Sequence, residues 1–183
     1  MVVQSTLNRG PEALAGRSTA DLAELFAGAA PPDPPLDGRY RGDLISATLA
    51  PAVDALFGRA FELTRPWLGK RFDADTGTGQ NLLDRRYWGP GRLLTPHRYR
   101  AWWPEDEQVF RALPFETAVG PSLLDPGHSV FQIDYDVDVN HPRVRRIRDE
   151  LVEVQPGVHL GQALWRRAGV HRLAWFWLAA DHH

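Results

Sequence analysis

The stretch that decides the fold covers residues 158–179 and reads VHLGQALWRRAGVHRLAWFWLA. Its two halves, 158–166 and 172–179, are short runs rich in apolar and aromatic residues, and each has the length of a strand. Between them, Ala168-Gly169 is a turn signal. The stretch therefore predicts two neighbouring antiparallel strands that form a β-hairpin.

Short apolar runs separated by turn signals also fill most of the chain upstream of this hairpin. Glycine and proline clusters recur at the spacing typical of an all-β protein. Hairpins between neighbours give a meander, and a long meander is best closed as a barrel because closure removes exposed edges. We therefore predict a mainly β domain, an antiparallel barrel. Its other expected strands are 39–45, 69–73, 80–84, 98–103, 109–116, 129–139 and 144–154.

Two helices are expected beside the barrel. Ser18 or Thr19 can cap a helix that runs to residue 26, and the proline-rich segment 31–35 then favours an extended spacer. Apolar residues at i, i+3, i+4 spacing predict a second helix over residues 51–63, after the first strand. The expected organisation is one globular unit with an N-terminal helical strap and spacer, residues 1–35, and a barrel domain, residues 36–183.

Composition excludes several classes of function. The chain has 183 residues and a net charge of −2, so it has no overall positive field to attract nucleic acid. It contains no cysteine, which excludes disulfides, thiol catalysis and thiolate zinc sites. A secretory signal pattern is missing, and the longest apolar run, 173–180, is far shorter than the roughly 20 residues that span a bilayer. We expect a cytoplasmic protein without membrane insertion, metal or cofactor.

Two short motifs resemble those of a known family. Residues 38–42 read GRYRG, and residues 67–72 read WLGKRF. These segments resemble the lipocalin-like small barrels of the calycin group, in particular bacterial domains of unknown function named for a Gly-x-Trp-x-Gly motif, with Tyr40 where that family has tryptophan. A weaker similarity covers later strands, residues 134–161. The resemblance implies a cup-shaped barrel whose cavity holds a hydrophobic molecule, as related barrels hold fatty acids or haem, and it implies no catalytic residues.

The segment 131–141, FQIDYDVDVNH, carries the most unusual local pattern. Strand alternation places Asp134, Asp136 and Asp138 on one face, and apolar residues with Tyr135 on the other. One interpretation is a solvent-facing strand neutralised by the arginines that follow. In another, Asp134 or Asp136 points into the barrel, where desolvation raises its pKa and makes it an acid or base. A divalent metal held by several of these carboxylates is the third.

Lys70 is conspicuous because it is the only lysine in the chain. It either pairs with a carboxylate at the barrel rim, or anchors a ligand carboxylate, or acts as an amine with a lowered pKa. Since it is followed by Arg71, at most one of the two faces inward. His159, the third catalytic candidate, shares a strand face with small residues that leave room for a ligand. The ligand-binding candidates are Tyr40, Trp67, Lys70, Arg71, Tyr135, Gln162 and Trp165.

These patterns leave three functions open. The first is a barrel that binds a hydrophobic or amphipathic small molecule in an apolar cavity. The second is a cyclase or isomerase that uses a carboxylate or histidine in that cavity for proton transfer. The two differ in whether two titratable groups converge within hydrogen-bond reach. A structural or interaction role becomes favoured if aromatic side chains fill the interior. Aromatic pairs such as Trp102 and Trp103 place one ring outside the barrel, which suggests helix packing or a homodimer.

Overall fold

The computed structural model describes residues 11–47, 66–89 and 101–181. Its single described α-helix is α1 (Thr19–Ala27), and its short 3-10 turns cover Pro11–Leu14, Arg85–Tyr87 and Val144–Arg146. The strands are β1 (Gly38–Ala47), β2 (Trp67–Asp73), β3 (Thr78–Asp84), β4 (Trp102–Pro104), β5 (Val109–Pro121), β6 (Ser129–Asp134), β7 (Ile147–Gln155), β8 (Val158–Arg166) and β9 (Val170–Ala180).

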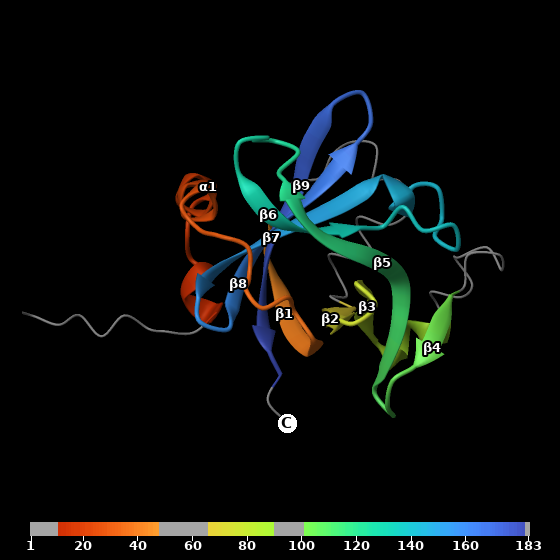
Figure 1. Ribbon diagram of the computed structural model, residues 1–183. Helices are drawn as coiled ribbons and strands as arrows, with labels where there is room; N and C mark the ends of the chain where they lie inside the picture. Colours follow the sequence, from red (N-terminus) through yellow and green to blue (C-terminus); the bar gives the residue numbers. More distant parts are fainter. Residues whose placement is uncertain (1–10, 48–65, 90–100, 182–183) are drawn as a thin grey trace, which may run out of the picture.

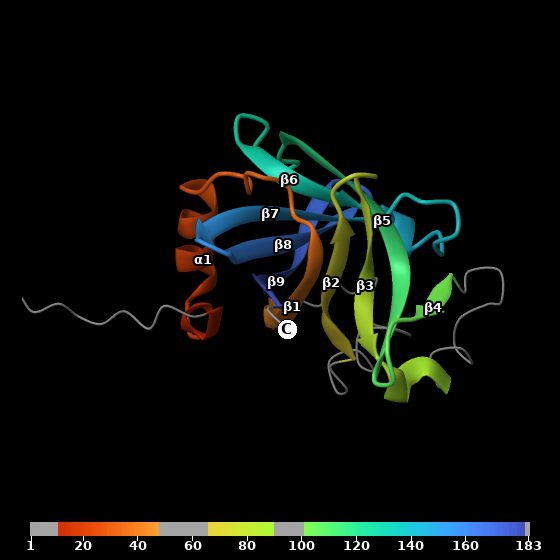
Figure 2. The same cartoon turned by 60° about the horizontal axis from the view of Figure 1, so that its bottom comes forward.

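Eight of these strands close into an antiparallel barrel, in the order β1-β2-β3-β5-β6-β7-β8-β9, and β9 pairs back with β1 (Figure 1). Closure depends on the length of β5, whose first part pairs with β3 and whose last part pairs with β6. Figure 2 shows β1, β2, β3 and β5 side by side along one wall. The short strand β4 pairs with the first part of β5 outside this ring. The predicted mainly β antiparallel barrel is confirmed.

The strand boundaries differ from the predicted ones at one important place. The hairpin in 158–179 forms as β8 and β9, with Val158 opposite Ala179. The strand expected over 129–139 is too long, because β6 ends at Asp134. There the Asp134 carboxylate accepts the N–H of Asp136, and the N–H of Val137 bonds to the carbonyl of Tyr135, so the chain turns. The second helix expected over 51–63 lies outside the described residues, as do residues 98–100 of the strand expected over 98–103, whose last two residues begin β4.

Helix α1 covers part of the outer barrel surface, beside β7 and β8 (Figure 1). It begins with a capping box in which Ser18 accepts the N–H of Asp21 and Asp21 accepts the N–H of Ser18. Leu22 and Phe26 are buried in an outer apolar core, where the Phe26 ring meets Trp175 edge-on at 5.6 Å. Among the described residues, no helix is long and apolar enough to span a membrane.

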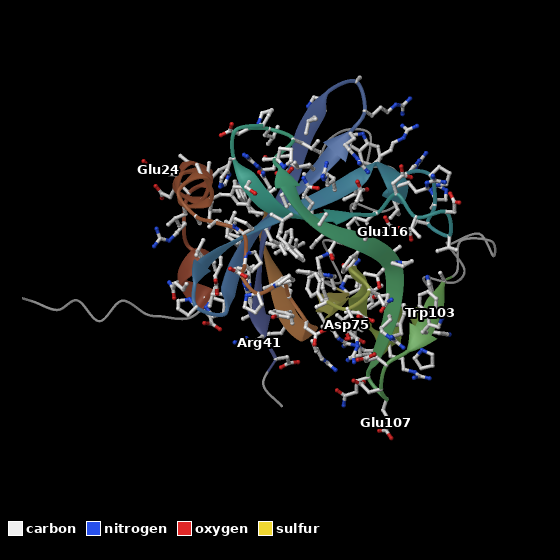
Figure 3. The ribbon with its side chains drawn as sticks, viewed as in Figure 1. Glu24, Arg41, Asp75, Trp103, Glu107 and Glu116 are labelled. Carbon is white, nitrogen blue, oxygen red and sulfur yellow. The ribbon has the colours of Figure 1, made fainter. Side chains whose placement is uncertain are left out.

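A second apolar core lies inside the barrel. Most of its members come from β2, β5, β6, β7 and β9, which lie around the ring, so this core is the interior. The exposed charged side chains of Glu24 and Glu107 lie at the edge of the molecule instead (Figure 3). The buried members of this inner core are Leu36, Phe72, Phe115, Phe131, Ile133, Tyr135, Leu151, Phe176 and Leu178.

Candidate functional site

A bulge in β2 brings Lys70 into the barrel together with Trp67. The two residues are three positions apart, so on a regular strand their side chains would face opposite sides. The register of the β2–β3 pair shifts between Trp67 and Gly69. Gly69 has a backbone φ of +142°, which residues with a Cβ rarely adopt. The Trp67 Nε1 and Lys70 Nζ atoms consequently both donate to Asn81 Oδ1, each at 2.9 Å.

Lys70, Asn81, Tyr135 and Asp149 form a buried polar group that we call the Lys70 cluster. None of the four is more than 4% exposed. Lys70 Nζ lies 2.9 Å from Asp149 Oδ2 and also donates to the Tyr135 hydroxyl oxygen. The Tyr135 hydroxyl donates to Asp149 Oδ2 at 3.0 Å and accepts from Asn81 Nδ2 at 3.0 Å. An amine, a phenol and a carboxylate therefore converge within hydrogen-bond distance inside the barrel.

Aromatic rings surround the ammonium group of Lys70. Its Nζ atom lies 5.1 Å from the ring centroid of Tyr135, 5.3 Å from that of Phe115, and 5.5 Å from those of Trp67 and Phe176. Cation–π attraction at such distances offsets part of the cost of desolvating the charge. The rings also exclude water, so each polar contact in the cluster acts in a low dielectric.

Half-buried apolar side chains border the inner core near the turn between β8 and β9, and we call them the apolar rim. Leu44 lies opposite Phe176 near the end of β1, Trp67 begins β2, and Ala163 lies opposite Ala174. All three pack against the inner core while remaining partly exposed. The rim is completed by Leu113, Val144 and Ile147.

Burial shifts the acid–base behaviour of the cluster. Desolvation lowers the pKa of Lys70, and the neighbouring Asp149 carboxylate opposes this effect without cancelling it. Burial also raises the pKa of Tyr135 well above its usual value, and the charge of Asp149 adds to the rise. Lys70 therefore gives up its proton more readily than an exposed lysine does, while the Tyr135 phenol stays protonated as a hydrogen-bond donor beside it.

His159, on β8, also lies in the interior. Its side chain is 2% exposed, and its ring meets the Tyr40 ring edge-on at 5.6 Å. The Nδ1 atom has no hydrogen-bond partner among the described residues. Burial lowers the pKa of His159, against the opposing influence of Glu153. Tyr40 lies opposite Lys70 in the β1–β2 pair, so the aromatic contact between Tyr40 and His159 borders the Lys70 cluster.

We predict that His159 makes stability depend on pH on the acid side. Since its pKa is lower in the folded state, the unfolded chain binds the proton more readily, and the free energy of unfolding falls as the pH drops below about 6.5. Between pH 7 and pH 5, His159 should cost the native protein roughly 1 kcal/mol of its free energy of unfolding, and the His159→Phe variant should not show this loss. Urea unfolding at the two pH values measures the difference. The exposed His171→Phe control should keep the slope of the native protein. Equal slopes for the His159 variant and the native protein would contradict the prediction.

The carboxylates of Asp134 and Asp136 lie outside the barrel, while Ile133 and Tyr135 face inward. Arg166 binds Asp134 with two hydrogen bonds, of 2.6 and 2.8 Å. Arg145 donates to Asp136 at 2.6 Å and contacts Asp138 at 2.9 Å. In the part of the chain that the structure describes, no three His, Asp or Glu side chains gather as metal ligands would.

The other ligand-binding candidates occupy different surroundings. Arg71 is exposed and pairs with Glu105 at 3.0 Å, on the face opposite Lys70. Gln162 is buried on the outer face, where it donates to Glu150 at 2.8 Å and accepts from Arg172 at 2.8 Å. Trp165 is 7% exposed. Of the predicted site residues, the structure brings Lys70, Tyr135 and Trp67 together.

Asn81 and Asp149 complete the cluster and were not among the predicted site residues. Asn81 lies opposite Lys70 in the β2–β3 pair. The glycines of the turn at residues 77–79 predict a hairpin between these two strands, and this hairpin brings Asn81 to face Lys70. Asp149 alternates with Ile147 and Leu151, two apolar residues that face inward. A carboxylate at an inward position of a strand is therefore the signal that could have identified it.

Comparison with known proteins supports the fold. No family model matches the chain, and no curated protein matches it. A crystal structure of a protein from Thermomonospora curvata is similar to this one, with a TM-score of 0.53 and 17% sequence identity. The similarity covers 91% of this chain and 89% of that one. At this identity, the similarity shows that the two chains share a fold.

Proposed function

We propose that the barrel binds a hydrophobic or amphipathic small molecule whose polar group contacts the Lys70 cluster. The observation that carries this proposal is the convergence of Lys70, Tyr135 and Asp149 inside a wall of aromatic rings, beneath the apolar rim. A ligand tail would contact the rim, and its polar group would bond to the amine or the phenol. The lipocalin-like relationship that the two sequence motifs imply belongs to the same proposal and is compatible with the closed antiparallel meander.

The energetics of the cluster support a functional role. Replacing a buried ion pair with apolar side chains of similar volume is often neutral or stabilising, so a buried pair adds little to stability by itself. The inner core already provides aromatic packing around the pair. A ligand that uses the hydrogen-bonding groups would explain why they remain in an otherwise apolar interior.

The charge balance favours an uncharged polar group on the ligand. Asp149 already supplies one negative charge at 2.9 Å from Lys70 Nζ. A ligand carboxylate would add a second negative charge beside it, and like charges in a desolvated site repel strongly. A hydroxyl or carbonyl oxygen can accept from Tyr135 or Lys70 without that cost. Ligand carboxylates, one of the partners expected for Lys70, are therefore disfavoured.

A second candidate function is acid–base catalysis of the isomerase or cyclase kind. It is favoured by one observation, that three titratable groups lie within hydrogen-bond distance of one another. Asp149 or neutral Lys70 would remove a proton, and the Tyr135 hydroxyl would hold the developing negative charge. Asp134 and Asp136, which lie outside the barrel, do not reach this site.

Calorimetric titration with 1-decanol and with decanoate tests the binding proposal. We expect 1-decanol to bind at one site and decanoate to bind at least about tenfold more weakly, because of the charge of Asp149. Ala163→Phe narrows the apolar rim and should abolish 1-decanol binding. Ala118→Phe, at an exposed position on β5, is the matched control and should preserve it. Heat signals that are equal for both variants, or absent for the native protein, would contradict the proposal and favour a structural role.

A further inference from the structure

Lys70 has the contacts of a reactive amine. Its Nζ atom is hydrogen-bonded to the Tyr135 hydroxyl and to Asn81 Oδ1, and it lies 2.9 Å from Asp149 Oδ2. A donor and an acceptor of protons therefore both lie beside the nitrogen, while Asn81 holds its position. Because no other lysine exists in the chain, the side-chain amine chemistry of the whole protein is concentrated at this buried position.

We infer that Lys70 forms a reversible imine with an aldehyde or ketone bound in the barrel. This inference rests on the proposed function, since the carbonyl compound must first enter the site. The expected ligand is a hydrophobic molecule with a carbonyl group at its polar end. Such a group is uncharged, in agreement with the charge balance set by Asp149.

The step uses the groups that the cluster supplies. The lone pair of neutral Lys70 attacks the carbonyl carbon, a C–N bond forms, and the π electrons of the carbonyl group move to its oxygen. That oxygen takes a proton from Tyr135, while Asp149 accepts one from the nitrogen and returns it to Tyr135 across their 3.0 Å hydrogen bond. The hydroxyl group then leaves with the second nitrogen proton as water, which produces the C=N bond.

The surroundings favour the imine over its hydrolysis. The rings of Trp67, Phe115, Tyr135 and Phe176 enclose the nitrogen and limit access of water to the C=N bond. Burial, which lowers the pKa of Lys70, increases the fraction of neutral amine available at neutral pH. An exposed lysine, whose pKa is about 10.4, is almost entirely protonated and unreactive at pH 7.

Reductive trapping with decanal and cyanoborohydride at pH 7 tests the inference. We expect the native protein to gain one reduced decyl adduct, which peptide mass spectrometry locates on Lys70. Adduct formation should be at least about tenfold faster than for Nα-acetyllysine under the same conditions, because the neutral amine fraction is larger. The N-terminal amine, the other primary amine of the chain, serves as an internal reference in the same spectrum.

Two variants identify what the cluster contributes. Tyr135→Phe removes the proton donor and should slow the adduct at Lys70 by about 10²-fold, with the rate taken at saturating decanal so that weaker binding does not enter the comparison. Lys70→Met combined with Asp149→Leu removes the amine and its counter-charge together, and should leave labelling only at the N-terminus. A Tyr135→Phe rate equal to that of the native protein would overturn the role given to the phenol.

The outcomes separate this inference from the proposed function. Binding of 1-decanol without a Lys70 adduct would overturn the imine and leave the binding proposal intact. Failure of both 1-decanol binding and Lys70 labelling would overturn both. An adduct confined to the N-terminus would show that Lys70 is not accessible to a carbonyl compound, and would likewise overturn the imine.

Discussion

Replacing Lys70 with methionine is expected to lower the free energy of unfolding by about 3–5 kcal/mol. Methionine has a similar length and no charge, so the change removes the partner of Asp149 while filling most of the same space. The Asp149 carboxylate, only 4% exposed, would then remain in the barrel without its cation. Urea unfolding at pH 7, followed by tryptophan fluorescence, measures the difference.

The partner variant distinguishes a stranded charge from lost packing. Adding Asp149→Leu to the Lys70→Met chain removes the isolated carboxylate, and should restore stability to within about 1–2 kcal/mol of the native protein. Arg71→Met, at the exposed neighbouring position, should cost at most about 1 kcal/mol. If Lys70→Met alone costs as little as Arg71→Met, then the buried ion pair does not exist as described.

Substituting Gly69 with alanine is expected to cost about 3 kcal/mol or more. An added Cβ would lie 2.0 Å from the carbonyl oxygen of Tyr40, and the backbone angle φ of +142° is unfavourable for any residue with a Cβ. Strands β1 and β2 would have to separate at the bulge that turns Lys70 inward. For a chain of this length, the thermal midpoint should fall by roughly 6–12 °C.

Gly16→Ala is the matched control for this substitution. No heavy atom lies within 4 Å of the Cβ that it would add, and its backbone needs no positive φ. The thermal midpoint of this variant should stay within about 2 °C of the native value. A Gly69→Ala variant with the same midpoint would show that the close approach of β1 and β2 is not required.

Much of the scaffold could be predicted from sequence because its signals are local. Turn residues and alternating apolar positions predicted the hairpin of 158–179 and the barrel around it. The end of β6 could not be predicted in this way, since it depends on an Asp134 side chain bonding to the N–H of Asp136 rather than on an apolar period. The alternation through residue 140 therefore suggested a longer strand than the one that forms.

The candidate site was predictable residue by residue but not as an assembly. Lys70, Trp67 and Tyr135 were identified separately, from rarity, from a motif and from a strand face. Their meeting requires the bulge at Gly69 and the pairing of distant strands, and Tyr135 and Lys70 are 65 positions apart. The inward position of Asp149 follows from its alternation with Ile147 and Leu151, but no local pattern shows that Lys70 is the residue it faces across the barrel.

The pairing of β1 with β9 also bears on how the chain folds. Tyr40 aligns with Ala180, so the final seam joins segments from opposite ends of the described chain. Contacts of such high sequence separation form late, because a large loop must close before they contribute any free energy. During synthesis, β1 and β8 would each have an open edge until β9 leaves the ribosome and inserts between them. Of the described strands β9 is made after the others, and it is thus the one that protects the nascent barrel from edge-to-edge aggregation.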